Sequence, residues 1–165
     1  QLLNTAKRTG SHLSIIEYGR KINEQMPEHV VKLTLDAFNE CKINIENSNI
    51  LILGVSYKPN VKDIQLTPAQ EIIEKLQERG ASVHIYDPYF VSTDIFGIQT
   101  ENNVDDVIQD LDACILVTAH DEFKKLPISL FNKMKHPILV DTRGVFDPLQ
   151  AESAKLTFRG LGRGK

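Results

Sequence analysis

The sequence predicts an α/β protein: a doubly wound parallel sheet preceded by a helical segment. Short continuous apolar runs, each ended by a glycine or a polar residue, alternate with stretches whose apolar residues recur at helical spacing. A strand buried on both faces of a parallel sheet has such an unbroken apolar run. Strands that alternate with helices predict βαβ units. We expect the helical segment over residues 1–47 and the sheet domain over residues 48–165.

The helical segment is predicted from about His12 to Cys41. Its residues Val31, Leu35 and Phe38 stand at i, i+4 and i+7, which is the apolar stripe of an amphipathic helix. Pro27 should either begin a second helix or kink a single long one.

The sheet domain begins with a predicted strand over residues 49–54. Thr67-Pro68-Ala69-Gln70 is a capping box with proline at the first helical position, and Gly80 should end that helix. Further strands are expected at Ser82–Tyr86, Asp112–Thr118 and Pro137–Val140, helices around Asn103–Gln109 and Ser129–Lys135, and a loop over Phe158–Lys165.

Composition narrows the class of protein. The chain has 165 residues, of which 41% are hydrophobic and 25% charged, values typical of one globular domain. Its net charge of -3 offers no basic field to nucleic acid or to an acidic membrane surface. No apolar run approaches the roughly 20 residues that span a bilayer. Two cysteines favour a reducing compartment, and Gln1 begins no leader, so we expect a cytoplasmic protein whose upstream part is missing.

Ligands of open parallel sheets bind beyond the carboxyl ends of the strands. The loop after the first strand has no glycine between Gly54 and Gly80, so the G-x-G-x-x-G cradle for a pyrophosphate is missing. Its Tyr57 ring and Lys58 cation suit a larger or differently held ligand. The alternative is an ordinary exposed Tyr-Lys pair.

Two more strand ends carry candidate residues. Arg143 follows the Pro137 strand, where its guanidinium could grip a phosphate or carboxylate. The alternative is a surface arginine paired with Asp141 or Asp147. Asp87 could bind a ribose hydroxyl, or it could be a turn residue before proline.

The histidines and cysteines indicate no further chemistry. The five histidines lack paired metal-ligand spacing, so no metal site is expected, and His120 is expected to cap a helix. Cys114 lies in mid-strand as an inert core thiol, and Cys41 ends a helix. Neither resembles a nucleophile.

Several motifs together resemble one family. The segment Leu51–Ala69 is similar to the C-terminal signature of the UDP-glucose/GDP-mannose dehydrogenase family, G-x-[AS]-[FY]-K-x-x-[TV]-x-D-x-R-x-S-P-A. The wording Y-K-P-N-V looks closest to the branch that acts on UDP-N-acetylhexosamines. Further agreement comes in order from R-K-I-N-E-Q-M-P at residues 20–27, V-H-I-Y-D-P-Y at 83–89, V-T-A-H-D-E-F-K at 117–124, V-D-T-R-G-V-F at 140–146 and R-G-L-G-R-G near the end.

The resemblance implies a Rossmann-like, UDP-sugar-binding domain of an NAD-dependent 6-dehydrogenase in polysaccharide biosynthesis. Such enzymes oxidise the primary alcohol of the sugar to a carboxylate, and NAD would be held mainly by an N-terminal domain that this chain lacks. The helical segment would form a homodimer. The family's nucleophilic cysteine, in a G-G-x-C motif, is absent, so we expect no catalytic residue and no activity of this chain alone. The alternative is a stand-alone, non-catalytic nucleotide-binding or assembly module.

Four residues match substrate-holding positions of the family: Tyr57, Lys58, Arg143 and, toward a partner subunit's substrate, Arg20. Two departures bear on this match. Gln65 replaces the arginine of D-x-R-x-S-P, and Gly144 replaces the usual asparagine after Arg143.

Overall fold

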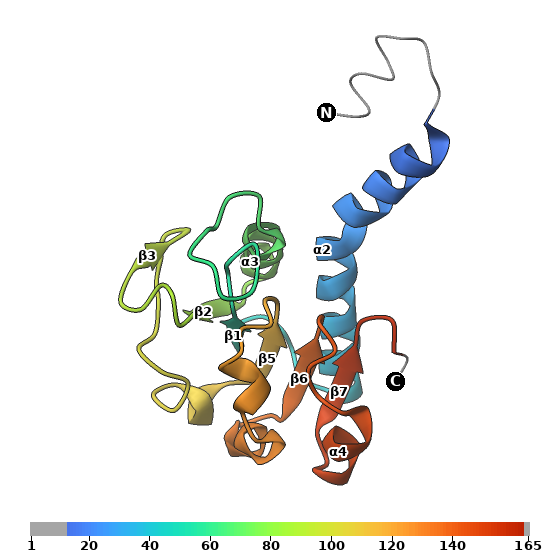
Figure 1. Ribbon diagram of the computed structural model, residues 1–165. Coiled ribbons are helices and arrows are strands. Elements are labelled where there is room, and N and C mark those ends of the chain that lie inside the picture. The colour runs from blue at the N-terminus through green and yellow to red at the C-terminus, as the bar shows by residue number, and fades with distance from the viewer. Residues whose placement is uncertain (1–12, 164–165) are drawn as a thin grey trace.

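A parallel sheet forms the centre of the protein, as the sequence predicts. The computed structural model describes residues 13–163, so His12 and the end of the expected tail lie outside it. Five parallel strands stand in the order β2-β1-β5-β6-β7 (Figure 1). Their bounds are β1 Asn49–Leu53, β2 Ser82–Tyr86, β5 Ala113–Leu116, β6 Ile138–Asp141 and β7 Thr157–Gly160. The order reverses between β1 and β5, which makes the sheet doubly wound.

Helical elements cover both faces of the sheet. One face carries α2 (Ser14–Glu40) and α3 (Pro68–Glu78). The other carries α4 (Pro148–Ser153) and the 3₁₀ helices η1 (Ile108–Asp110), η2 (Phe123–Lys125) and η3 (Ile128–Lys133). A short antiparallel hairpin, β3 (Asp94–Ile95) and β4 (Ile98–Gln99), forms a separate two-stranded sheet.

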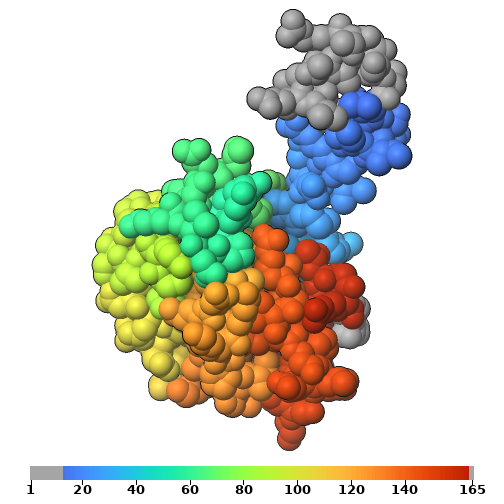
Figure 2. Space-filling view, in the orientation of Figure 1, coloured from blue at the N-terminus to red at the C-terminus, as the bar shows by residue number. Residues whose placement is uncertain are grey.

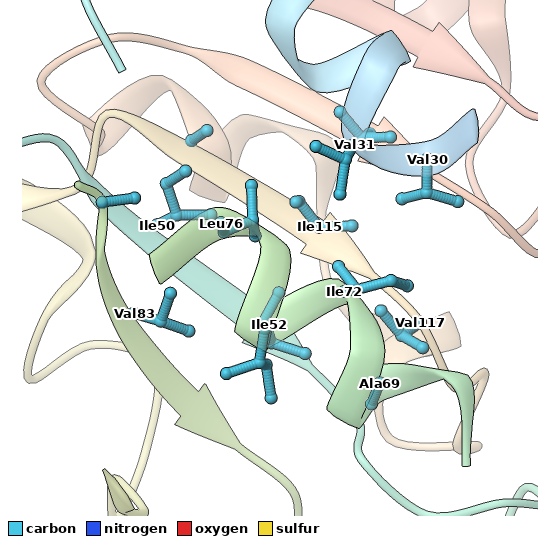
Figure 3. Packing of buried hydrophobic residues seen from close by; sticks show 14 of the residues in the cluster. Val30, Val31, Ile50, Ile52, Ala69, Ile72, Leu76, Val83, Ile115 and Val117 are labelled. Atoms are coloured by element: carbon cyan, nitrogen blue, oxygen red, sulfur yellow. The ribbon is translucent and has the colours of Figure 1, made fainter. Parts of the chain in front are cut away.

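The side chains of β1 alternate between two separate cores. Ile50 and Ile52 pack toward α2 and α3, in one cluster with Ile72 and Leu76 of α3 (Figure 3). Leu51 and Leu53 enter the second core, on the face of α4 and the 3₁₀ helices. All four strand residues are fully buried. Each contributes on the order of 1.5–3 kcal/mol of apolar burial, and this is why the strand carries no polar alternation.

The helical segment is one long helix with Pro27 inside it, so the kink alternative holds rather than a second helix. Proline has no N–H to donate to the carbonyl of Asn23, one turn earlier. Figure 1 shows the helix bending and its N-terminal part extending past the carboxyl ends of the strands. The C-terminal part is buried through Val30 and Val31, whereas the N-terminal part stands away from the body (Figure 2).

Three expected elements were wrong. The helices around Asn103–Gln109 and Ser129–Lys135 are only the 3₁₀ helices η1 and η3. Neither has a side-chain N-cap, whereas the equally short α4 is capped by the Asp147 side chain. Residues 158–160 of the expected loop belong to β7. Its sequence T-F-R-G has a single apolar residue, so only pairing with β6 reveals the strand.

The ends of α3 follow the sequence with one exception. The Thr67 hydroxyl accepts from the Ala69 N–H at 3.3 Å, as a capping residue should. The side chain of Gln70 bonds to Glu74 instead of returning to Thr67, so the reciprocal half of the capping box is not formed. Gly80 ends the helix with φ +83 and two backbone bonds in the Schellman pattern.

Gly54 and Gly19 provide a matched test of the β1–β5 junction. A Cβ at Gly54, where φ is +83, would lie 2.7 Å from both the Cβ and the carbonyl oxygen of Thr118. We expect Gly54→Ala to cost at least roughly 1–3 kcal/mol from the backbone alone. Gly19→Ala, in an open helical position, should instead stabilise by roughly 0.5–1 kcal/mol. Urea denaturation measures both, and equal effects would contradict the close approach of the two strand ends.

Candidate functional site

A pocket of about 480 Å³ lies at the carboxyl ends of the strands. It is bounded by the bend of α2, the loop after β1, the start of α3 and the loops after β5, β6 and β7. Its polar lining is Asn23, Tyr57, Lys58, Thr142 and Arg143. Its apolar lining is Met26, Pro27, Val30, Leu66, Pro68, Ile72, Val117 and Leu161. The pocket adjoins the reversal of strand order between β1 and β5, where ligands of such sheets bind.

Three of the four predicted site residues meet in this pocket: Tyr57, Lys58 and Arg143. Arg20 does not line it. Its side chain lies on the projecting part of α2 and forms an exposed ion pair with Glu24 at 2.8 Å. Gln65 is exposed and outside the lining.

Sequence reasoning missed several lining residues, among them Asn23, Thr142 and Leu161. A signal was present for Asn23, because it belongs to the same R-x-x-N-E-x-M-P stretch as Arg20. No local pattern marks Leu161, which reaches the pocket only because β7 pairs with β6.

Arg143 is held by backbone groups and not by an acid. Its Nε donates to the carbonyl of Val117 at 2.6 Å. The buried Asp141 carboxylate accepts from the backbone N–H groups of Arg143, Gly144 and Phe146 and so shapes the loop. Among residues 13–163 the guanidinium has no ion pair. The expected alternative, a pairing with Asp141 or Asp147, is therefore wrong.

The backbone conformation and the neighbours of residue 144 explain why glycine suits this position, where the family has asparagine. Its φ is +70, a left-handed conformation that glycine adopts freely and asparagine more readily than most residues. A Cβ here would lie 2.4 Å from Nη2 of Arg163, whose guanidinium donates to the Gly144 carbonyl at 3.2 Å. The glycine thus keeps the loop conformation and leaves room for Arg163.

Tyr57 and Lys58 lie near the start of the loop after β1. The Lys58 Nζ stands 5.8 Å from the centroid of the Tyr57 ring, which is 47% exposed. The backbone N–H of Tyr57 donates to the carbonyl of Asp63 at 2.7 Å, which closes the loop on itself. In the part of the chain that the structure describes, Lys58 also has no ion pair.

Asp87 anchors this loop. Of the two roles considered for it, the turn residue is therefore the one that the structure shows, because its carboxylate is not accessible to a ribose. The side chain is fully buried, and Oδ2 accepts from the N–H of Val55 at 2.9 Å and from the N–H and hydroxyl of Ser56. Oδ1 accepts from the N–H of Tyr89. Burial would raise the pKa of the Asp87 carboxyl, but the hydrogen bonds from His120, Tyr89 and Val55 outweigh it and lower that pKa.

His120 is also buried, and its side chain caps no helix, contrary to expectation. Its Nε2 lies 3.0 Å from Oδ2 of Asp87, and its Nδ1 accepts from the backbone N–H of Asn60 at 2.9 Å. The ring therefore joins the loop after β1 to the ends of β2 and β5. Sequence reasoning missed this contact because the partners are about 30 and 60 residues away.

The cysteines take no part in the pocket. Cys114 is buried in the sheet, where burial raises the pKa of its thiol. Cys41 contacts the Thr157 hydroxyl at 3.2 Å. Within residues 13–163 no group of three or more His, Cys, Asp or Glu side chains could hold a metal ion, and no helix there is long and apolar enough to cross a membrane.

The sequence of the sheet domain matches a family model over residues 51–148, that of the UDP-glucose/GDP-mannose dehydrogenase family, UDP binding domain. The match includes more than half of the chain and both cationic loops of the pocket. The chain belongs to this family.

Curated relatives and solved structures agree with this membership. UDP-glucose 6-dehydrogenase TuaD of Bacillus subtilis is 30% identical over 98% of the chain, and the UDP-N-acetyl-D-mannosamine dehydrogenase of Pyrococcus horikoshii is 30% identical over 99%. The chain spans 35% and 36% of these relatives, about a third of their length. The crystal structure of the NDP-N-acetyl-D-galactosaminuronic acid dehydrogenase from Methanosarcina mazei superposes with a TM-score of 0.87 at 25% identity, covering 99% of this chain and 36% of that one.

Substitution of Asp87 tests the anchor at neutral and acidic pH. Asp87→Asn should lower the free energy of unfolding at pH 7 by about 2–4 kcal/mol, because buried donors lose a charged acceptor. Since the folded-state pKa lies below the unfolded value of about 3.9, the carboxylate stabilises the fold above that pH, and its contribution disappears as pH falls through the folded pKa.

The difference between wild type and Asp87→Asn should therefore be constant from about pH 5 to 7 and shrink below about pH 4. Denaturant titrations at several pH values measure it. The exposed Asp63→Asn is the control and should stay within about 0.5 kcal/mol of wild type. A difference that grows on acidification would contradict the lowered pKa.

Proposed function

We propose that this chain is the part of a nucleotide-sugar 6-dehydrogenase that holds a UDP-sugar, with the diphosphate between Lys58 and Arg143. The charge of the pocket carries the proposal. Its described lining has two cations and no acidic residue, and neither cation is neutralised by an ion pair within residues 13–163. A planar guanidinium forms paired bonds to phosphate oxygens, and an ammonium adds a point charge.

The rest of the pocket suits the uncharged ends of such a ligand. The half-exposed Tyr57 ring offers a surface on which a base or a sugar ring could stack. Met26, Val30 and Ile72 provide an apolar wall. The first residue of α3, Pro68, also lines the pocket, so the positive end of the helix dipole adds to the field of the two cations.

We further propose that the longer protein oxidises the primary alcohol of the sugar to a carboxylate with NAD as the hydride acceptor. The relatives from Bacillus subtilis and Pyrococcus horikoshii are dehydrogenases of UDP-sugars, which supports this reaction. The residues of this chain do not fit the NAD pyrophosphate. The loop after β1 has no glycine beyond Gly54, and α3 begins only at Pro68, so no helix N-terminus follows the strand directly. NAD would thus bind elsewhere, and inactivity of this chain alone stays a prediction, as does its cytoplasmic location.

The projecting part of α2 supports a homodimer. Ile15, Tyr18 and Ile22 stand at i, i+3 and i+7 and are 89%, 68% and 56% exposed. This is the apolar seam of a helix that packs on another helix, and within residues 13–163 nothing covers it. Arg20 lies on the same part of the helix. In such a dimer it would lie near the partner subunit, as its predicted role toward the partner's substrate requires.

Binding of UDP tests the proposed ligand. UDP should raise the melting temperature of the chain, and Lys58→Met or Arg143→Met should each weaken UDP binding about tenfold or more, because a charged hydrogen bond contributes roughly 1.5–3 kcal/mol. Lys133→Met, on η3, is the control and should leave the affinity unchanged. Absence of any shift at millimolar UDP would count against the proposal.

Mass in solution tests the dimer. Ile22→Asp should convert the dimer to monomer, since a charge cannot be buried in an apolar seam without a large penalty. Ile22→Leu is the matched control and should keep the dimer. Light scattering over a range of concentrations measures both, and a dimer that survives Ile22→Asp would place the interface elsewhere.

A further inference from the structure

One buried polar cluster fixes both ends of the segment that carries Tyr57 and Lys58. At the near end, Asp87 accepts from Val55 and Ser56, and the Thr118 hydroxyl donates to the Ser56 carbonyl at 2.6 Å. Near the far end, His120 accepts from the backbone N–H of Asn60. Only residues 57–59 lie between these anchors, so the anchors fix the backbone from which the Lys58 side chain extends.

The contacts of His120 define one protonation state. Because Nδ1 accepts a backbone N–H, it carries no proton, and the ring proton sits on Nε2, which donates to Asp87. The ring packs against two aromatic side chains: the centroid of Tyr89 lies 5.0 Å away and that of Phe123 5.4 Å away. His120 is thus a fixed donor and acceptor between two strand ends and a loop.

The far anchor is reinforced by a second pair of bonds. The Asn60 side chain donates to the Asp121 carboxylate at 2.9 Å and accepts from the Asp121 N–H at 3.1 Å. Asn60 has a φ of +61, a conformation that asparagine tolerates. Three bonds from residues 120–121 therefore hold one residue of the loop, next but one to Lys58.

We propose that His120 is a positioning residue for the UDP-sugar site: its Nε2–H tautomer ties Asp87 to Asn60 and so holds Lys58 at the pocket. This inference rests on the proposed function. His120 lies outside the pocket lining and acts through the loop. A binding group that is displaced by about 1 Å loses a large part of its contribution to the affinity for the ligand.

The opposite end of the sheet offers a matched control. There His136 bonds to Asp112 at 2.7 Å, and Asp112 accepts from the backbone N–H of Asn49 at 2.8 Å. This pair has the same chemistry, but it lies at the amino ends of the strands, away from Lys58 and Arg143. Substitution of His136 should lower the stability of the fold but leave the geometry of the pocket unchanged.

UDP titration calorimetry on the chain tests the proposal with three substitutions. His120→Phe keeps the ring packing but removes both hydrogen bonds, and it should weaken UDP binding about tenfold or more. His120→Gln, whose amide can donate to Asp87 and accept from Asn60, should restore the affinity to within about threefold of wild type. His136→Phe should leave it unchanged. A folded His120→Phe variant that binds UDP as wild type does, or a His136→Phe variant that loses as much, would overturn the role.

Two measurements without ligand separate this inference from the proposed function. Amide hydrogen exchange in residues 55–63 should accelerate in His120→Phe but not in His120→Gln or His136→Phe. Nitrogen chemical shifts of wild-type His120 should show an unprotonated Nδ1, and a protonated Nδ1 would overturn the proposal even if His120→Phe does not fold. If wild type binds no UDP while exchange follows the expected pattern, the proposed ligand is wrong and the anchoring of the loop stands.

Discussion

The buried carboxylate of Asp87 is the interaction on which the candidate site depends. A chain that leaves β1 has backbone donors at Val55 and Ser56 that no neighbouring strand satisfies, and both are buried. Asp87, directly after the adjacent β2, accepts both and is also hydrogen-bonded to the Ser56 hydroxyl, the Tyr89 N–H and His120. Without this acceptor the loop would have to move outward to hydrate its N–H groups, and Lys58 would move with it.

Asp141 solves the same problem on the other side of the pocket. It ends β6, is fully buried, and accepts three backbone N–H groups of the loop that carries Arg143. Two aspartates at strand ends thus shape two loops, and each loop presents one cation to the same pocket. Both acids are already satisfied by donors of the protein, so they do not neutralise the cations that they position.

The sequence predicted what local patterns encode. Unbroken apolar runs located β1, β5 and β6, because a strand buried on both faces has no polar alternation. Strand β7 escaped detection since Phe158 is its only apolar residue. Their places after predicted strands and the family motifs singled out Tyr57, Lys58 and Arg143. The role of His120 could not be foreseen, because its bonds to Asp87 and Asn60 join strand ends far apart in the chain.

The loop after β1 uses a different strategy from a glycine-rich turn. A glycine-rich turn holds pyrophosphate with backbone N–H groups that the turn itself fixes in place. Here the N–H groups of Val55, Ser56 and Tyr57 all bond within the protein, so the positive charge of this loop comes from the side chain of Lys58. A lysine loses conformational entropy when it binds an anion. A rigid loop base limits that loss, which is a physical reason for a fully hydrogen-bonded cluster directly behind the pocket.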